Sequence, residues 1–425
     1  MERNSMSKLH FGRGVLGLTA ALAAGATLLA GPATAVTAAP SPAPHSAPGL
    51  YTGHAATQAA LDGTVAAGAP GVQAQAQVGG DTWFGAAGTA DLSSGRPFRP
   101  GDEFRIGSIT KSFVATVLLQ LEAEKKLSLD DTMDRLLPGV VQGNGNDGRH
   151  ITLRQVLNHT SGLFNYTEDS ALRTRMGGQG FLDHRYETYR PQQIVAIALA
   201  HPPNFAPGTS WSYSNTNYIV AGMVVQKVTG HSYAQEIERR ILRPLGLRST
   251  SVPGTSPTIP GRHGRAYSVL FAQTPDRLYD VTEFNPSLAG SAGEMISTTA
   301  DLNRFFSALL RGRLLPAHQL DEMLTTVSTG PDTPDLRYGL AMMSVRLPCG
   351  VTVWGHDGGI FGSSSSAATT RDGRHSLSSN VNADWVESPV APVVPEFCPS
   401  SSATSPTTAS PATAFRTTLA RATGF

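Results

Sequence analysis

A serine and a lysine three residues apart could carry out nucleophilic chemistry in this chain. Ser108 and Lys111 lie just before a run of apolar residues at helical spacing. On a helix this spacing places both side chains on one face, where the amine can take the hydroxyl proton. The alternative is that Ser108 caps the helix and Lys111 is solvated. The same Ser-x-x-Lys pattern occurs at residues 5–8, where no catalysis is expected, so Ser108 needs partners elsewhere in the chain.

Two further polar stretches could supply these partners. Tyr213 and Asn215 lie in a polar loop, where a tyrosine can relay protons and an amide can hold a substrate carbonyl. Residues 356–359 read His-Asp-Gly-Gly between two expected strands, and a backbone N–H group there can point at a developing oxyanion. Each stretch also has an ordinary structural interpretation, since Tyr and Asn are common in loops and His-x-Gly recurs at residues 10–12.

The elements around these stretches predict a sheet built from both ends of the chain. Residues 72–78 alternate strictly, and a Gly-Gly turn leads into a return strand at 82–84. Strands return at 342–347, at 351–354 and on both sides of a turn at 372–373, whereas 151–246 is mostly helical and 301–310 predicts one more helix. We therefore expect an α/β fold of the α+β type, with an antiparallel sheet flanked by helices and an all-helical lobe at about 151–254.

The two ends of the chain differ in composition from the part between them. Lys8 and Arg13 precede an uncharged run at 14–30 and a small-residue cleavage site at 33–35, which is typical of a secretory signal peptide. A membrane anchor is the alternative. We expect a secreted, extracellular protein without a membrane span after signal cleavage. Its parts are a signal peptide at 1–35, a linker at 36–48, a folded domain at 49–398 and a disordered tail at 399–425.

Charge and cysteine content narrow the functional classes. The formal net charge is +1, with 33 basic and 32 acidic residues and no long run of either sign, so neither nucleic acid nor an anionic membrane is an expected partner. The two cysteines, Cys349 and Cys398, both lie in the part that would be exported. Oxidising conditions favour a disulfide between them, and two free buried cysteines are the alternative.

Taken together, the three polar stretches resemble the serine β-lactamase and penicillin-binding family. Ser-x-x-Lys, Tyr-x-Asn and His-x-Gly occur in that order, on an expected helix, in the helical insert and at a late strand. Residues 151–163 and 213–218 support the likeness, which runs from about 49 to 398. It is closest to secreted actinomycete D-alanyl-D-alanine carboxypeptidases, followed by class C β-lactamases and related esterases. The two cysteines also fall where that group carries a disulfide.

The resemblance implies a role for each matching residue. Ser108 is implied to be the acylated nucleophile, Lys111 its base partner and Tyr213 the proton relay. Asn215 is implied to hold the acyl-side amide, and the backbone N–H groups of Ser108 and Gly359 to form the oxyanion hole. The other substrate-binding residues that we expect along the cleft are His356, Asp357, Gly358, Phe164 and Trp211. No metal and no other cofactor is implied.

The implied activity is hydrolysis through an acyl-enzyme. The leading hypothesis is an exported D-alanyl-D-alanine carboxypeptidase acting on peptidoglycan-type peptides. The alternatives within the same fold are an esterase, an amidase, a D-aminopeptidase or a class C-like β-lactamase, and a non-catalytic penicillin-binding-like protein is a third hypothesis. The implied partners are a peptidoglycan stem peptide or an ester as substrate, and β-lactam antibiotics as acylating ligands.

The sequence departs from this family at several positions. Asp357 stands where many relatives place a Thr for the substrate carboxylate, and the basic cluster expected near 342–345 is reduced to Arg346. Both changes predict a substrate that lacks a C-terminal anion or that binds in another pose. Residues 363–370 are rich in serine where a core strand would alternate apolar residues. Prolines at 389, 392 and 395 predict that the C-terminal helix is short or that this region is degraded.

Overall fold

The computed structural model describes residues 53–271, 277–386 and 389–398. The expected signal peptide, linker and tail lie outside the described residues, as do residues 49–52 at the expected start of the domain. Within the described ranges, no helix combines the length and the apolar character needed to cross a membrane.

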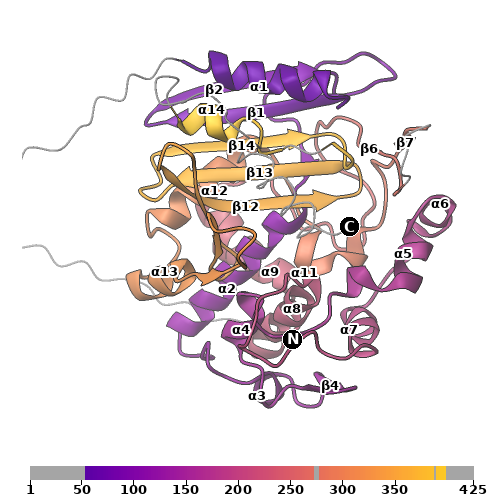
Figure 1. The fold of residues 1–425 in the computed structure, drawn as a ribbon, viewed down its shortest axis with the longest axis vertical. Coiled ribbons are helices and arrows are strands. Elements are labelled where there is room, and N and C mark those ends of the chain that lie inside the picture. The colour runs from indigo at the N-terminus through magenta and orange to yellow at the C-terminus, as the bar shows by residue number, and fades with distance from the viewer. Residues whose placement is uncertain (1–52, 272–276, 387–388, 399–425) are drawn as a thin grey trace, which may run out of the picture. The chain divides into compact units, whose positions relative to one another are not determined.

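An eight-stranded antiparallel sheet is the centre of the fold (Figure 1). Its strand order is β2-β1-β14-β13-β12-β11-β10-β9. Val72 pairs with Val381, so the first and last strands of the chain lie side by side, which confirms the expected sheet built from both chain ends. The strands are β1 (Gly71–Val78), β2 (Asp81–Gly88), β9 (Val327–Ser328), β10 (Leu336–Tyr338), β11 (Met343–Arg346), β12 (Thr352–Ile360), β13 (Ser363–Thr370) and β14 (His375–Val381).

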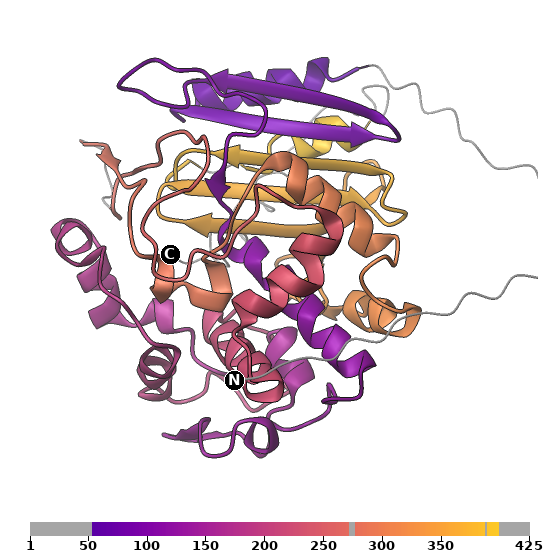
Figure 2. The ribbon, with the colours of Figure 1, turned by 180° about the vertical axis from the view of Figure 1, so that it is seen from behind.

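Helices cover both faces of this sheet. On one face, Leu61 of α1 (Ala55–Ala66) and Phe397 of α14 (Val393–Phe397) share a buried apolar cluster with β1 and β14. On the other face lies α12 (Thr299–Leu310), seen from behind in Figure 2. Asn303 of α12 donates to the carbonyl oxygen of Gln75 (2.8 Å) and accepts from the Ser378 hydroxyl (2.7 Å). The covering helices thereby fix both faces of the central strands.

The helical lobe follows the hairpin in sequence and carries most of the remaining core. A 3-10 turn, η1 (Gly107–Ile109), leads into α2 (Thr110–Ala123), whose side chains are almost all buried. The fold class expected from sequence is thereby confirmed. The other helices of the lobe and its surroundings are α3 (Met133–Leu136), α4 (Leu153–Leu157), η2 (Tyr166–Glu168), α5 (Ser170–Met176), α6 (Gln179–His184), α7 (Pro191–Leu199), α8 (Asn215–Thr229), α9 (Tyr233–Ile237), the π-helical turn η3 (Glu238–Leu242), α10 (Arg243–Leu245), η4 (Pro286–Leu288), α11 (Gly290–Gly293) and α13 (Ala317–Leu324).

Short two-stranded pairings complete the described fold. Strand β3 precedes η1 in the sequence, and its partner β8 precedes α12. The N–H group of Ile106, which follows β3, donates to the carbonyl oxygen of Met295 (2.9 Å). The short strands are β3 (Phe104–Arg105), β4 (Gln142–Gly143), β5 (Asn146–Asp147), β6 (Tyr267–Ser268), β7 (Tyr279–Asp280) and β8 (Ile296–Ser297).

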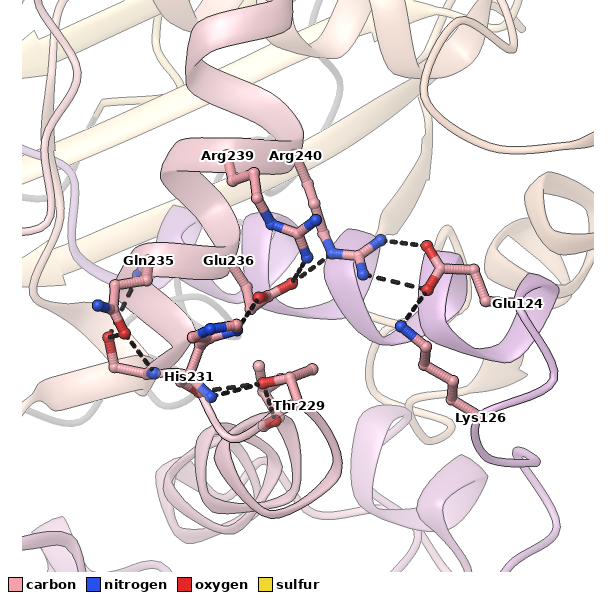
Figure 3. A network of polar contacts seen from close by, with 10 residues as sticks. Glu124, Lys126, Thr229, His231, Gln235, Glu236, Arg239 and Arg240 are labelled. Atoms are coloured by element: carbon pink, nitrogen blue, oxygen red, sulfur yellow. Dashed lines mark hydrogen bonds and ion pairs between the residues drawn. The ribbon is translucent and has the colours of Figure 1, made fainter. Parts of the chain in front are cut away.

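A polar network fastens α9 and η3 to the C-terminal end of α2 (Figure 3). The buried carboxylate of Glu236 accepts from Arg239 (2.6 Å) and from Arg240 (2.5 Å). Arg240 also donates through two nitrogens to the carboxylate of Glu124, just beyond the end of α2. Paired guanidiniums supply the hydrogen bonds that a buried carboxylate requires. The helix that carries Lys111 near its start is therefore fixed at its far end.

The serine-rich segment lacks the apolar alternation of a core strand but is a central strand, as expected for the run before the turn at 372–373. β13 pairs with β12 over its whole length and with β14 over residues 364–369. Its serines face backbone carbonyls of the chain just before η1: the Ser363 hydroxyl donates to Arg105 O (2.7 Å) and the Ser365 hydroxyl to Ile106 O (3.0 Å). Large apolar side chains would remove these two hydrogen bonds to buried carbonyl groups, so small hydroxyl side chains fit this strand.

The C-terminal helix is short, which confirms one of the two alternatives expected from its prolines. α14 has five residues, with Pro392 at its N-cap and Pro395 at its third position. Cys349, between β11 and β12, forms a disulfide with Cys398 at a Cα–Cα distance of 5.7 Å. The disulfide ties the end of α14 to the sheet.

Candidate active site

The turn η1 and the first turn of α2 bring Ser108 and Lys111 into contact. The Lys111 side-chain nitrogen lies 2.8 Å from the Ser108 hydroxyl, and both side chains are buried. Gly107 enters this turn at φ +51°, and a Cβ atom there would lie 2.6 Å from the carbonyl oxygen of Gly359. Only glycine combines that backbone conformation with so close an approach. The sequence pattern therefore places the two side chains as expected, next to β12.

Lys111 has three oxygen partners in a fully buried setting. Besides Ser108, Nζ lies 2.7 Å from Asn215 Oδ1 and 2.6 Å from the carbonyl oxygen of Ala292. Burial lowers the pKa of Lys111 well below its ordinary value, which favours the neutral amine. A neutral amine has two hydrogens, and the oxygens of Asn215 and Ala292 can only accept them. Its lone pair then points at the Ser108 hydroxyl, so the amine can act as the base for that hydroxyl.

Asn215 is held by residues that the sequence patterns did not single out. It is the first residue of α8, and its N–H group donates to Asn165 Oδ1 (3.0 Å). Its side-chain nitrogen lies 3.4 Å from the Thr167 hydroxyl, which directs Oδ1 toward Lys111. Asn165 and Thr167 lie two and four residues after the family-like stretch at 151–163, and that position was the only available signal for them. In the structure Asn215 orients Lys111.

Tyr213 lies against Lys111 with its hydroxyl buried. The Lys111 nitrogen is 4.9 Å from the centre of the Tyr213 ring. The Tyr213 hydroxyl makes no hydrogen bond of ordinary geometry to any of the described residues. Burial raises the pKa of Tyr213, whereas the neighbouring Ser108 hydroxyl acts in the opposite direction. A protonated phenol without a fixed partner, beside a serine and a neutral amine, can pass a proton to a group that enters the site.

Strand β12 passes close to the Ser108 turn and leaves one edge open. β11 pairs with β12 only as far as Gly355, so residues 356–360 pair with β13 on one side alone. A Cβ atom on Gly358 would lie 1.9 Å from Ile106 O and 3.0 Å from Ser108 N. The predicted oxyanion donors, Ser108 N and Gly359 N, therefore belong to adjacent backbone segments. The His-x-Gly stretch lies within β12 itself, which corrects the expectation that it separates two strands.

His356 is buried and hydrogen-bonded, unlike a residue presented to substrate. Its Nε2 lies 2.8 Å from the Tyr338 hydroxyl and its Nδ1 lies 2.5 Å from Asp357 O. Burial, with a smaller contribution from Lys111, lowers the pKa of His356 to about 3. The imidazole is therefore neutral at ordinary pH.

Asp357 is also buried, and its neighbours are mostly apolar. It lies opposite Ser366 of β13 and lines a small pocket with Val353, Val390 and Val393. Burial raises the pKa of Asp357 to about 7, and a hydrogen bond with Ser366 opposes this shift. Near neutral pH its charge is therefore partial, which weakens the repulsion of anionic substrates expected from the sequence.

The two expected cleft walls are half-buried. The Phe164 ring stacks on His201 at 3.9 Å, while its carbonyl oxygen accepts from the hydroxyls of Ser214 and Thr216 on either side of Asn215. Trp211 packs against Tyr338, with ring centres 5.9 Å apart. Through the described ranges, no group of three or more His, Cys, Asp or Glu side chains is arranged to bind a metal ion.

Comparison with known proteins identifies relatives of the whole domain. The family model described as Beta-lactamase matches residues 56–373. The solved D-stereospecific amidohydrolase from Streptomyces sp. is 54% identical, with a TM-score of 0.77, covering 81% of this chain and 99% of that one. The D-amino acid amidase from Ochrobactrum anthropi SV3, solved with D-phenylalanine, is 30% identical, with a TM-score of 0.69, covering 80% of this chain and 98% of that one.

A curated relative matches over a shorter length. Penicillin-binding protein 4* of Bacillus subtilis (strain 168) is 27% identical over 286 residues, which are 64% of this chain. The match spans 59% of that relative's own length.

Proposed function

This chain belongs to the beta-lactamase family of serine hydrolases, and we propose that it is a D-stereospecific amidohydrolase acting through an acyl-enzyme on Ser108. The observation that carries the chemistry is the contact of 2.8 Å between Ser108 and a lysine whose burial favours the neutral amine. The choice of substrate is supported by the 54% identity to the Streptomyces amidohydrolase over 99% of its length.

The proposed reaction uses the groups around Ser108 in two half-reactions. Lys111 takes the proton of Ser108 as the serine oxygen bonds to the substrate carbonyl carbon, and the N–H groups of Ser108 and Gly359 stabilise the oxyanion. The C–N bond then breaks, and the leaving amine receives a proton through Tyr213. Water attacks the acyl-enzyme in the second half-reaction, returns a proton to Ser108 and releases the free acid.

A D-alanyl-D-alanine carboxypeptidase is the second proposal, supported by the likeness to a penicillin-binding protein. Two features of the chain favour the amidohydrolase instead. Asp357 replaces the usual Thr, and Arg346 is the only basic residue of the stretch at 342–347. A substrate amide or ester has no C-terminal carboxylate and needs neither group. We further propose, from the sequence of residues 1–35, that the enzyme is secreted.

A panel of acyl donors tests the proposal and separates it from the alternatives. The panel contains D-phenylalanine amide, L-phenylalanine amide, a D-Ala-D-Ala peptide, a penicillin and a simple ester. Turnover is measured for each, and covalent adducts are detected by intact-protein mass spectrometry, with Ser108→Ala as the control. We expect the D-amide to be hydrolysed at least about a hundredfold faster than the L-amide and the D-Ala-D-Ala peptide, a difference of about 3 kcal/mol in transition-state binding. Faster turnover of the D-Ala-D-Ala peptide would establish the carboxypeptidase, and no adduct with any donor would contradict both proposals.

A further inference from the structure

A chain of buried hydrogen bonds connects the loop that carries Tyr213 to β12. It begins at His159, whose Nδ1 lies 3.2 Å from Ser214 N and 3.1 Å from Asn217 Nδ2. His159 Nε2 lies 3.2 Å from the Tyr338 hydroxyl, and that hydroxyl lies 2.8 Å from His356 Nε2. The chain ends where His356 Nδ1 meets the carbonyl oxygen of Asp357 at 2.5 Å.

Backbone groups at the two ends fix the direction of every proton in this chain. At the first end, Ser214 N–H can only donate, so His159 Nδ1 must accept. Asn217 presents its nitrogen to the same atom, because its oxygen accepts from the Ser161 hydroxyl (2.6 Å). At the last end, the carbonyl oxygen of Asp357 can only accept, so His356 Nδ1 must carry a hydrogen.

With both imidazoles neutral, only one arrangement of the hydrogens between these ends leaves every bond intact. His159 carries its hydrogen on Nε2 and donates to the Tyr338 oxygen. Tyr338 donates its own hydrogen to His356 Nε2. Both imidazoles are then neutral and are opposite tautomers, and burial lowers the pKa of His159 and of His356, as this arrangement requires.

The chain holds together the two sides of the active site. The centres of the His159 and Tyr213 rings are 4.3 Å apart. His159 also accepts a hydrogen bond from the N–H group of Ser214, the residue after Tyr213. His356 is in β12, two residues before Gly358, which packs against the Ser108 turn. His159 is held for this task at φ +64°, a conformation that few side chains adopt.

We propose that His159, Tyr338 and His356 are positioning residues that set the placement of Tyr213 relative to Ser108 and to β12, the strand that carries the predicted oxyanion donor Gly359 N. This chain of hydrogen bonds keeps the site active in mildly acidic conditions. A proton added to His159 Nδ1 would face the N–H group of Ser214 and the side-chain nitrogen of Asn217, so donors would meet and the chain would break at that end. A proton added to His356 Nε2 would displace the hydrogen that Tyr338 donates there. The charged or titratable side chains that face the two imidazoles are Lys111 from α2, Tyr213 from the preceding loop, Tyr218 from α8 and Tyr338 from β10.

Nitrogen NMR of the wild-type protein tests the proton arrangement without any substrate. The proposal rests on the serine-hydrolase site but not on the identity of its substrate, so this measurement separates the two. We expect neutral imidazoles between pH 5 and 8, with the hydrogen on Nε2 of His159 and on Nδ1 of His356. Signals are assigned by their loss in His159→Asn and His356→Asn. A protonated imidazole at pH 6, or the same tautomer at both residues, would overturn the proposal.

Kinetics of a matched pair of variants tests the effect on catalysis. Tyr338→Phe interrupts the chain at its middle, and Tyr267→Phe is the control because Tyr267 is also buried and its hydroxyl accepts from Leu92 N–H (2.8 Å), outside the chain. Both variants lose a hydrogen bond and should lose stability. We expect only Tyr338→Phe to lower kcat about tenfold or more with KM within about twofold, since small displacements of reacting groups lower kcat. Its acidic limb should move up by about one pH unit, because His356 Nε2 no longer receives a hydrogen. Equal kcat and equal acidic limbs in the two variants would refute the positioning role.

Discussion

The close approach of β12 to the Ser108 turn predicts a large effect of a single methyl group. In Gly358→Ala the added Cβ atom would lie 1.9 Å from Ile106 O, 2.9 Å from Ile106 C and 3.0 Å from Ser108 N, which are all backbone atoms. Contacts of a Cβ atom below 3.0 Å essentially never occur. The turn and the strand must therefore separate by at least about 1.1 Å, which lengthens a hydrogen bond of about 2.9 Å to about 4 Å and breaks it.

The broken bond would be one of the two predicted oxyanion contacts. Loss of one such donor lowers kcat about a hundredfold to a thousandfold. We expect this loss in Gly358→Ala with the best substrate of the acyl-donor panel, while Ser108, Lys111 and Tyr213 remain unchanged. Gly355→Ala is the matched control, because its Cβ atom would lie 1.8 Å from Ala367 O in the neighbouring strand and not against the Ser108 turn. It should lose comparable thermal stability but keep kcat within about threefold. A Gly358→Ala variant with kcat within threefold of wild type would refute the placement of the oxyanion donors.

Three further outcomes are expected. Ser108→Ala should lose both turnover and the covalent adduct while its thermal midpoint stays close to that of the wild type, and an adduct persisting in this variant would exclude Ser108 as the nucleophile. Removal of the Cys349–Cys398 disulfide, which closes a loop with a sequence separation of 49, should lower the free energy of unfolding by about 4 kcal/mol, measured by denaturant titration of the double serine variant; an unchanged midpoint would contradict this. Burial raises the pKa of Asp357 to about 7, against about 4 in an unfolded chain, so its contribution to stability is full below about pH 4 and is lost as the pH rises through 7. The thermal midpoint of Asp357→Asn, measured relative to that of the wild type, should therefore be higher at pH 8 than at pH 4. A difference that does not change with pH would show that Asp357 is solvated.

The sequence predicted those parts of the fold and site that depend on neighbouring residues. The hairpin β1–β2 and the contact between Ser108 and Lys111 follow from local periodicity and spacing, so they could be expected without a structure. Asn165 and Ala292 could not, because their contacts with Asn215 and Lys111 join residues 50 and 181 positions apart. A local pattern contains no information about such contacts.

The composition of the serine-rich strand could not be explained from the sequence, for a related physical reason. The pattern of residues 363–370 lacks the apolar alternation of a core strand, and that alternation was the only signal available. In the structure the hydroxyls meet the carbonyls of Arg105 and Ile106, which lie about 260 residues earlier in the chain. The partner that makes polar residues suitable in a buried strand is visible only after folding.

The pairing of β1 with β14 also sets the order in which an active molecule can be assembled. Ser108, Lys111 and Tyr213 precede residue 214, whereas β12 and the two strands that join it to β1 occupy 352–381. Bringing Val72 to Val381 closes a loop of about 300 residues, which costs about 5 kcal/mol of chain entropy before any sheet contact offsets it. A growing chain that ends before β12 therefore contains the nucleophile, the base and the relay but lacks the strand with the second oxyanion donor. Without β14, strand β1 also has an unpaired edge. Activity should appear only when synthesis has passed Val381, so acylation of Ser108 in a series of truncated chains would report sheet closure directly.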